Sequence, residues 1–321
     1  MPNTADEIID RRRLRRKLTF WRVAALAIAA IAIIASGFGL FADRFGPKAT
    51  DHIAKVRVEG TITDDEELLK RLKAVGESDA VKGVILAVDS PGGTTAGGEA
   101  IYEAVRKISA QKPVVAQVGT LAASAGYMIS SASDHIVARQ SSIVGSIGVL
   151  FQFPDVTGLM DKIGVKLEGV KSSPLKAEPS PFSPTTDEER EMIRAMIMDS
   201  YDWFVGLVEE RRPLSRAEVL ALADGSVFTG RQALENKLVD SLGGEDEARA
   251  WLEDKGLAKN LKVIEWKADT GAQAWLSAGS ATAALARLLG MPAGGDLLSD
   301  IGADRIFLDG LVSVWHPEKA R

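Results

Sequence analysis

Short apolar runs alternate with amphipathic segments through the middle of the chain, and this alternation constrains the fold more than any other feature. Residues 53–58, 81–88 and 114–118 are typical of strands, because they are short, apolar and followed by turn-forming residues. Helical periodicity occupies the intervals 64–75 and 96–109. Strands separated by helical crossovers run parallel. The pattern therefore predicts an α/β domain with a largely parallel sheet and flanking helices.

The same alternation continues to about residue 260. We expect strands at 135–138, 147–151 and 165–170, and helices at 124–131, 155–163, 187–212, 216–223, 230–236 and 246–255. The sequence divides into a basic segment (1–22), an apolar segment (23–42), a linker (43–52), the main domain (53–260) and a C-terminal extension (261–321). Within the main domain, residues 172–186 contain four prolines and are expected to form a loop.

The N-terminal segments predict a membrane anchor. Residues 23–42 carry no charge, and as a helix they would span about 30 Å, the thickness of a bilayer's hydrocarbon core. The preceding 22 residues carry seven basic and three acidic side chains, a balance of +4. This charge predicts a cytoplasmic N-terminus, with the rest of the chain across the membrane. The alternative is a cleaved signal peptide, for which Ala35-Ser36-Gly37 is a marginal cleavage site.

Composition removes several kinds of chemistry. The chain has no cysteine, which excludes disulfides, thiolate zinc sites and a cysteine nucleophile. The chain has only three histidines, so a multi-histidine metal site is not expected, and neither a metal nor a cofactor is predicted. The basic cluster precedes an apolar segment, so nucleic acid is not an expected partner. Gly92-Gly93 follows a strand without a subsequent Gly-Lys-Ser/Thr, which argues against a phosphate loop.

Ser124 is the candidate nucleophile. It lies between a predicted strand and a predicted helix, in Gly119-Thr120-Leu121-Ala122-Ala123-Ser124-Ala125-Gly126-Tyr127. Small residues permit a tight turn, and the N–H groups of a helix N-terminus can stabilise negative charge that develops in a reaction. The alternative interpretation is a serine that caps the helix.

A serine nucleophile needs a base, and no histidine suits the position. His52 adjoins the linker, His316 lies near the C-terminus, and the intervening helix should carry His135 to the other end of a strand. Lysine is the alternative base if its pKa is lowered by desolvation or by a neighbouring cation. Lys176 and Lys171 both lie near the proline-rich loop, and composition does not choose between them.

Four motifs in this order resemble those of the bacterial signal peptide peptidase family. They are Asp89-Ser90-Pro91-Gly92-Gly93, Ala122-Ala123-Ser124-Ala125-Gly126-Tyr127, Gly145-Ser146-Ile147-Gly148 and Lys171-Ser172-Ser173-Pro174-Leu175-Lys176. The chain is similar to the short, single-repeat form of these Ser/Lys-dyad peptidases, over roughly residues 53–245. It departs from the usual pattern at Ala125 and at Ser173, where glycine is common.

This resemblance implies a ClpP/crotonase-like fold and a set of roles. Ser124 would be the nucleophile, Lys176 the general base and Ser146 the residue that orients the lysine. Gly93 and Ala125 would supply the N–H groups of an oxyanion hole, with Gly92 shaping the loop. The implied substrates are signal peptides left in the membrane after protein export. The implied location is the bacterial inner membrane, with the catalytic domain outside the cytoplasm.

The resemblance also implies ring-shaped homo-oligomers, in which Lys176 of one chain can serve Ser124 of its neighbour. The main alternative is a broader quality-control peptidase that acts on unfolded or membrane-associated polypeptides. An acyl-CoA hydratase-like enzyme would need carboxylates near the oxyanion loop, for which Asp89 and Glu99 are the candidates. A scaffold that has lost catalysis is the third alternative.

Overall fold

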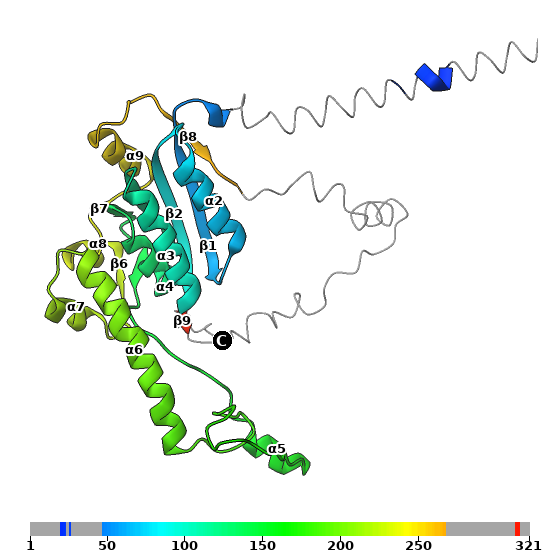
Figure 1. Cartoon of the computed structure of the whole chain (residues 1–321). Coiled ribbons are helices and arrows are strands. Elements are labelled where there is room, and N and C mark those ends of the chain that lie inside the picture. Colours follow the sequence, from blue (N-terminus) through cyan, green and yellow to red (C-terminus); the bar gives the residue numbers. More distant parts are fainter. Residues whose placement is uncertain (1–19, 24–25, 27–46, 268–311, 315–321) are drawn as a thin grey trace, which may run out of the picture. The chain divides into compact units, whose positions relative to one another are not determined.

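The computed structural model describes residues 20–23, 26, 47–267 and 312–314 of the 321 residues (Figure 1). The chain divides into two units, residues 1–50 and 51–321. The first contains the short 3-10 helix η1 (Pro47–Ala49). Of the predicted anchor only Val23 and Leu26 are described, so this prediction lies outside the described residues. Within the described part, no helix is both long enough and apolar enough to cross a membrane.

The second unit is built on one sheet, which has nine strands within the described residues, and the order β6-β5-β3-β2-β1-β8 forms its main path. Strand β4 pairs with β3 and β7, and β9 pairs with β2. The strands are β1 (His52–Ile62), β2 (Val81–Thr94), β3 (Val114–Ala123), β4 (His135–Ala138), β5 (Ile143–Gly145), β6 (Val227–Thr229), β7 (Ser241–Leu242), β8 (Lys262–Glu265) and β9 (Val312–Val314). All pairings are parallel except β5 with β6 and β2 with β9. The predicted α/β class with a largely parallel sheet is therefore confirmed.

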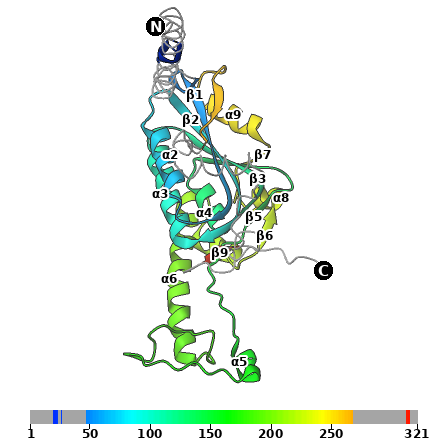
Figure 2. The ribbon, with the colours of Figure 1, turned by 90° about the vertical axis from the view of Figure 1, so that its right-hand side faces the viewer.

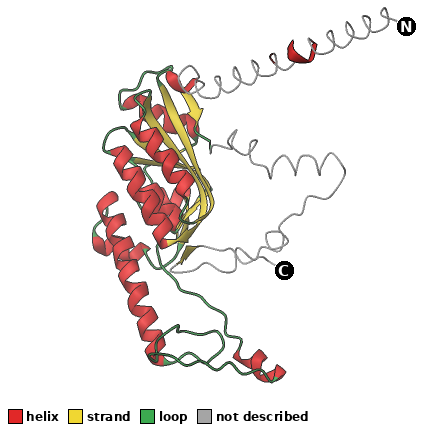
Figure 3. Cartoon of the chain, turned by 45° about the vertical axis from the view of Figure 1, so that its right-hand side comes forward, coloured by secondary structure: helices red, strands yellow, loops and turns green. Residues whose placement is uncertain are grey.

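Helices α2, α3 and α4 lie against one face of this sheet (Figure 3). The helices are α2 (Glu66–Glu77), α3 (Thr95–Ser109), α4 (Ala125–Ser131), α5 (Thr157–Ile163), α6 (Asp187–Arg211), α7 (Arg216–Leu222), α8 (Gly230–Glu235) and α9 (Glu245–Asp254). Local sequence fixes several of their starts. The Asp65 carboxylate accepts a hydrogen bond from the Leu68 N–H, and Thr186 and Glu189 form a capping box at the start of α6.

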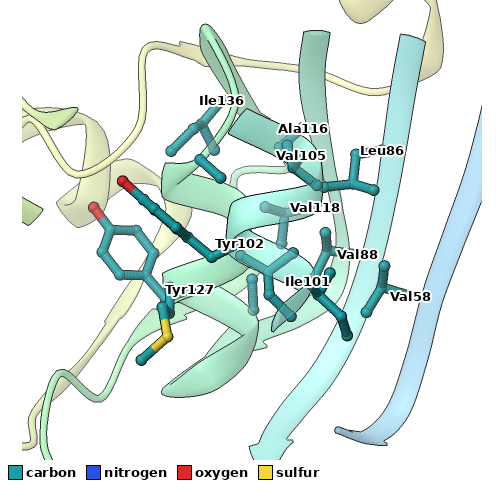
Figure 4. Packing of buried hydrophobic residues seen from close by; sticks show 14 of the residues in the cluster. Val58, Leu86, Val88, Ile101, Tyr102, Val105, Ala116, Val118, Tyr127 and Ile136 are labelled. Carbon is teal, nitrogen blue, oxygen red and sulfur yellow. The ribbon is translucent and has the colours of Figure 1, made fainter. Parts of the chain in front are cut away.

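Alternating residues of the central strands form two separate cores. In β1, Ala54, Val56 and Val58 face the larger core, which also contains apolar residues of α2, α3, α4 and α6. Figure 4 shows Ile101 and Val105 of α3 packed beside residues of β2 and β3 in this core. Ile53 faces the opposite side, where a smaller core contains Leu252 of α9. Both faces of the sheet are thus buried near the strand starts, as in other parallel sheets.

Two predicted strands are absent. Residues 147–151 form no strand, because the chain turns at Gly145 and Ser146, which have φ of 110° and 52°, and the apolar run that follows lines a cleft instead. Residues 165–170 also form no strand: they are exposed and lie beside no other strand. The strand that the structure does contain here is β5, which ends at Gly145, before the predicted strand at 147–151 would begin.

Residues 157–186 extend away from the sheet. Helix α5 and the loop between α5 and α6 lie beyond the end of α6 that is distant from the sheet, in both views of the ribbon (Figures 1 and 2). Helix α5 contains no buried residue. We call residues 157–186 the arm.

Candidate active site

Ser124 occupies a strained turn between β3 and α4. Its backbone has φ of 58° and ψ of −121°, a conformation that residues other than glycine rarely adopt. The Ser124 N–H donates to the Gly145 carbonyl at 2.8 Å, which ties this turn to the end of β5. The residue is at the N-cap position of α4, but its side chain makes no capping hydrogen bond. The capping interpretation is therefore wrong, and a strained serine between a strand and a helix is the geometry of a nucleophile elbow.

Small residues around Ser124 allow α4 to lie directly on β2. Ala122, Ala123 and Ala125 are completely buried. A Cβ on Gly126 would lie 2.9 Å from the Ser90 carbonyl oxygen, closer than real Cβ atoms come to other atoms. The strand register pairs Ser90 with Ala122. These contacts bring the turn at Ser124 beside the carboxyl end of β2.

The end of β2 is shaped by its glycines and by one serine. Gly92 has φ of 108°, and its N–H donates to the Ser90 hydroxyl at 3.1 Å. The same hydroxyl donates to the Gly60 carbonyl at 2.6 Å. A Cβ on Gly93 would lie 1.8 Å from the Ile62 carbonyl oxygen, so only glycine fits there. The Gly92 N–H thus has a partner within the loop, and Gly93 pairs with Ile62 of β1 and with Ser313 of β9, so the oxyanion role of Gly93 stays a prediction.

Ser146 lies in the same cleft as Ser124. The cleft has a volume of 580 Å³, and both serines line it. The Ser146 N–H donates to the Ser226 carbonyl at 2.7 Å, which holds the residue at its positive φ. The remaining lining residues are mostly apolar and include Val149, Leu150, Ile197, Met198 and Tyr201. The cleft can therefore accept an apolar side chain next to Ser124.

Lys176 does not line this cleft. It is exposed and lies on the arm, in the loop between α5 and α6. Lys171, the other candidate base, forms an ion pair with Glu178, and the hydrogen bond from Lys171 lowers the pKa of the Glu178 carboxyl. The Lys171 ammonium is engaged by this carboxylate, so the ion pair argues against Lys171 as a base. Within one chain, the structure brings Ser124 and Ser146 together but not Lys176.

The two described histidines have structural partners away from the cleft. His52 accepts a hydrogen bond from the Trp266 indole at the start of β1. His135 begins β4, stacks on Trp251 and lies 2.9 Å from the Ser241 hydroxyl. Burial lowers the pKa of His135. His316 is outside the described residues. The expectation that His135 lies away from Ser124 agrees with this placement.

The carboxylates required for hydratase-like chemistry do not line the cleft either. Asp89 accepts a hydrogen bond from the Leu121 N–H and lines a different cavity, together with Lys55 and Arg139. Glu99 is exposed on α3. The sequence analysis did not identify Ser90 as the residue that shapes the glycine loop. Its position two residues before the glycines is a usable signal, because short hydroxyl side chains bond to nearby backbone groups in turns.

A parallel α/β sheet with a strained serine between strand and helix is the arrangement of a serine hydrolase. The sequence profile of Peptidase family S49 matches residues 106–260, and that of Clp protease matches residues 51–143. The chain belongs to peptidase family S49 and is a serine protease.

Three relatives illustrate this membership. A putative protease of Methanocaldococcus jannaschii is 39% identical, over 63% of this chain and 65% of its own length. A putative protease of Synechocystis is 39% identical, over 62% of this chain and 72% of its own. A putative signal peptide peptidase SppA of Enterococcus faecium is 37% identical, over 70% of each chain. The chain thus matches about two thirds of the length of these relatives.

Proposed function

We propose that the protein is a membrane-anchored endopeptidase with a Ser124–Lys176 dyad, and that it degrades signal peptides left after protein export. The observation that carries the nucleophile is the strained backbone of Ser124 at the start of α4. Strain of this kind costs free energy, and it persists where function requires it. The position of Ser146 in the same cleft supports the proposal that Ser146 orients the lysine.

In the proposed mechanism, neutral Lys176 accepts the proton of the Ser124 hydroxyl as the oxygen attacks a peptide carbonyl carbon. The N–H groups of Gly93 and Ala125 stabilise the resulting oxyanion, and each such donor is worth about 3–4 kcal/mol. The C–N bond then breaks and Lys176 protonates the leaving amine. A water molecule then attacks the carbonyl carbon of the acyl-enzyme as Lys176 accepts a proton from it. The bond from this carbon to the Ser124 oxygen breaks, Lys176 returns the proton to that oxygen, and the carboxylic acid product leaves.

The position of Lys176 favours a site that two copies complete. Lys176 is on the arm, whose side chains include exposed Leu159, Ile163 and Leu167. Exposed apolar residues gathered on one segment are typical of protein contacts. In the proposed homo-oligomer, the arm of one copy contacts the next and places its Lys176 beside the neighbour's Ser124 and Ser146. This contact would also remove the Lys176 amine from water.

Mixing inactive variants tests this arrangement. Ser124→Ala and Lys176→Met should each lower the rate of peptide cleavage by about 10⁴-fold or more. A mixed oligomer should regain part of the activity, because some sites combine an intact Ser124 with an intact Lys176. Lys171→Met is the matched control and should keep its activity, since Lys171 is paired with Glu178. Full activity of Ser124→Ala would reject the nucleophile, and stable mixed oligomers without activity would place both residues of the dyad in one chain.

The apolar lining of the cleft supports signal peptides as substrates, because their central segments are apolar. The second candidate, a broader quality-control peptidase, has support from the same lining, since unfolded chains also expose apolar side chains. The two candidate functions predict different relative rates for cleavage of signal peptides and of denatured proteins. A signal-peptide enzyme should cleave synthetic signal peptides at a kcat/KM at least tenfold above that for a denatured soluble protein, whereas equal values favour the broader role.

The proposed location is the bacterial inner membrane, with residues 23–42 as a single uncleaved anchor. Cell fractionation should find the full-length chain in the inner membrane. A protease added to the outside of spheroplasts should degrade the catalytic domain and leave the basic N-terminal segment intact. A soluble chain that begins after residue 37 would instead indicate a cleaved signal peptide.

A further inference from the structure

The face of the sheet opposite α2, α3 and α4 changes in character along its strands (Figure 3). Near the strand starts, the side chains on this face are apolar and pack against α9, among them Ile53, Ile85 and Val115. Every second residue of a strand stands on the same face. Further along the same strands the face is polar, with Lys55, Arg57, Asp89 and Gln117. Parallel sheets usually bury apolar side chains on both faces, so this polar half is unusual.

A cavity of 500 Å³ lies over this polar half. Sites for small molecules usually have volumes of about 300–1,000 Å³. The charged residues that line the cavity are three basic and three acidic ones, Lys55, Arg57, Arg139, Glu59, Asp89 and Glu245. It shares no lining residue with the cleft that holds Ser124. A second site with charges of both signs therefore exists on the opposite side of the sheet from that cleft.

Most of these charges are already paired within the chain. Lys55 forms an ion pair with Glu245, and Arg57 forms one with Glu59. Within the described residues, neither Arg139 nor Asp89 takes part in an ion pair. One cation and one anion of the cavity are thus left for a ligand that carries both charges.

Gly119 separates these two charges. In the strand registers, Asp89, Gly119 and Arg139 follow three residues that are paired across β2, β3 and β4. Neighbouring strands are about 4.8 Å apart, so two strand spacings put about 10 Å between the backbones that carry the two charges. A Cβ on Gly119 would lie 2.9 Å from Oδ2 of Asp89, so the carboxylate extends over the glycine towards β4. Two residues of extended peptide span at most about 7 Å, which suits the shorter gap between the charged groups themselves.

Gln117 adds an amide to the floor of the cavity. Its side chain is only 7% exposed, and Nε2 donates to the Val118 carbonyl at 3.1 Å. In the part of the chain that the structure describes, no group donates to its Oε1. A buried acceptor without a donor costs free energy, which a donor from a ligand would recover. The N–H of a peptide bond is a donor of this kind.

We propose that this cavity binds short peptides with free termini. Asp89 receives the ammonium group of the peptide, Arg139 its carboxylate, and Oε1 of Gln117 accepts a hydrogen bond from the peptide N–H between them. Short peptides are what a peptidase releases, so the source of the ligand rests on the function proposed above. The binding itself needs only the three side chains, not the chemistry of Ser124.

Binding of the dipeptide L-alanyl-L-alanine to the full-length Ser124→Ala protein tests the site without turnover. Its methyl side chains offer little apolar surface to the Ser124 cleft, which keeps the measurement specific. We expect isothermal titration calorimetry to find a single site with a Kd of about 1 mM or lower. No detectable binding at about 20 mM dipeptide would overturn the proposal.

Modified ligands identify which side chain holds which end. In the Ser124→Ala background, Asp89→Asn loses the charge but keeps an oxygen for the Leu121 N–H, which the carboxylate now accepts. It should weaken the dipeptide about tenfold or more, and should hardly change binding of the N-acetylated dipeptide, which has no ammonium group. Arg139→Gln should show the same pattern towards the dipeptide carboxamide, which has no carboxylate.

Arg194→Gln is the matched control, because Arg194 is exposed on α6 and does not line the cavity. It removes the same charge as Arg139→Gln and should bind the dipeptide as the parent protein does. If the Asp89 and Arg139 variants also bind it with the parent's affinity, the dipeptide occupies another place and the proposal is wrong.

The outcomes for this site and for the proposed function are separate. A wild-type protein that cleaves peptides, in a background whose Ser124→Ala form binds no dipeptide, keeps its proposed function and lacks the second site. A protein that binds the dipeptide through Asp89 and Arg139 but cleaves no peptide has the second site and contradicts the proposed function.

Discussion

The strained backbone of Ser124 predicts an unusual response to substitution by glycine. The conformation of Ser124, φ 58° and ψ −121°, costs about 1–3 kcal/mol for a residue with a side chain and little for glycine. Glycine in turn has a larger backbone entropy in the unfolded chain, which offsets about 0.5–1 kcal/mol. Ser124→Gly should therefore be more stable than Ser124→Ala, by about 1 kcal/mol.

Urea unfolding of the two variants, at equal protein concentration, measures this difference. Both variants lack the hydroxyl, so neither has a nucleophile and the comparison isolates the backbone. Ser131 provides the matched control, because it is also buried, in α4, but with an ordinary helical backbone. There Ser131→Gly should be less stable than Ser131→Ala, by about 1 kcal/mol.

The sign of the difference at position 124 decides the argument. If Ser124→Gly is the less stable variant, by an amount similar to that at position 131, then the turn holds no strain. The nucleophile assignment would then lose its main support. A stable but inactive Ser124→Gly protein would agree with a backbone strained for function, as is common at catalytic residues.

Further predictions concern two glycines, a buried ion pair and a partly buried histidine. Gly93→Ala should lower the free energy of unfolding by several kcal/mol and abolish activity, because its Cβ would lie 1.8 Å from a backbone oxygen of β1. Gly206→Ala, which meets nothing within 4 Å in α6, should leave activity intact and raise stability by up to about 1 kcal/mol in the same urea assay. Arg212→Ala should cost about 3–5 kcal/mol, since the buried guanidinium pairs with both oxygens of Asp240, and a loss below 1 kcal/mol in thermal unfolding would contradict this. Burial lowers the pKa of His135, so the folded state binds its proton less readily than the unfolded state, and stability should decrease as pH falls below about 6.5. Urea unfolding at pH 7.5 and pH 5.5 should show a smaller decrease in His135→Gln.

The sequence predicted the fold well where apolar periodicity was strong. The predicted strand at 135–138 has the same bounds as β4, and the predicted helix at 187–212 differs from α6 by one residue. The predicted strand at 114–118 was too short, because β3 continues to Ala123. Its last residues include Gly119, Ala122 and Ala123, which have low strand propensity, and the segment is extended because β2 and β5 pair with it.

The site was predicted in part. Small residues around Ser124 indicated a tight turn, but its positive φ depends on the packing of α4 against β2 and has no sequence signal of its own. The ion pair of Lys171 with Glu178, which bears on the choice between Lys171 and Lys176, was not predicted. Strand β9 was also missed, since three residues are too few to give a pattern and their partner strand is distant in sequence.

The arm has a consequence for when such an enzyme works. A lone chain carries its serine in the cleft and its lysine at the end of the arm, so in the proposed mechanism a single copy hydrolyses nothing. The rate would then depend on encounters between copies, and at low concentration, where two copies must meet, it would rise with the square of the amount of protein. Under this proposal a newly made chain would be harmless to the polypeptides around it, and proteolysis would begin only once enough copies had accumulated to meet.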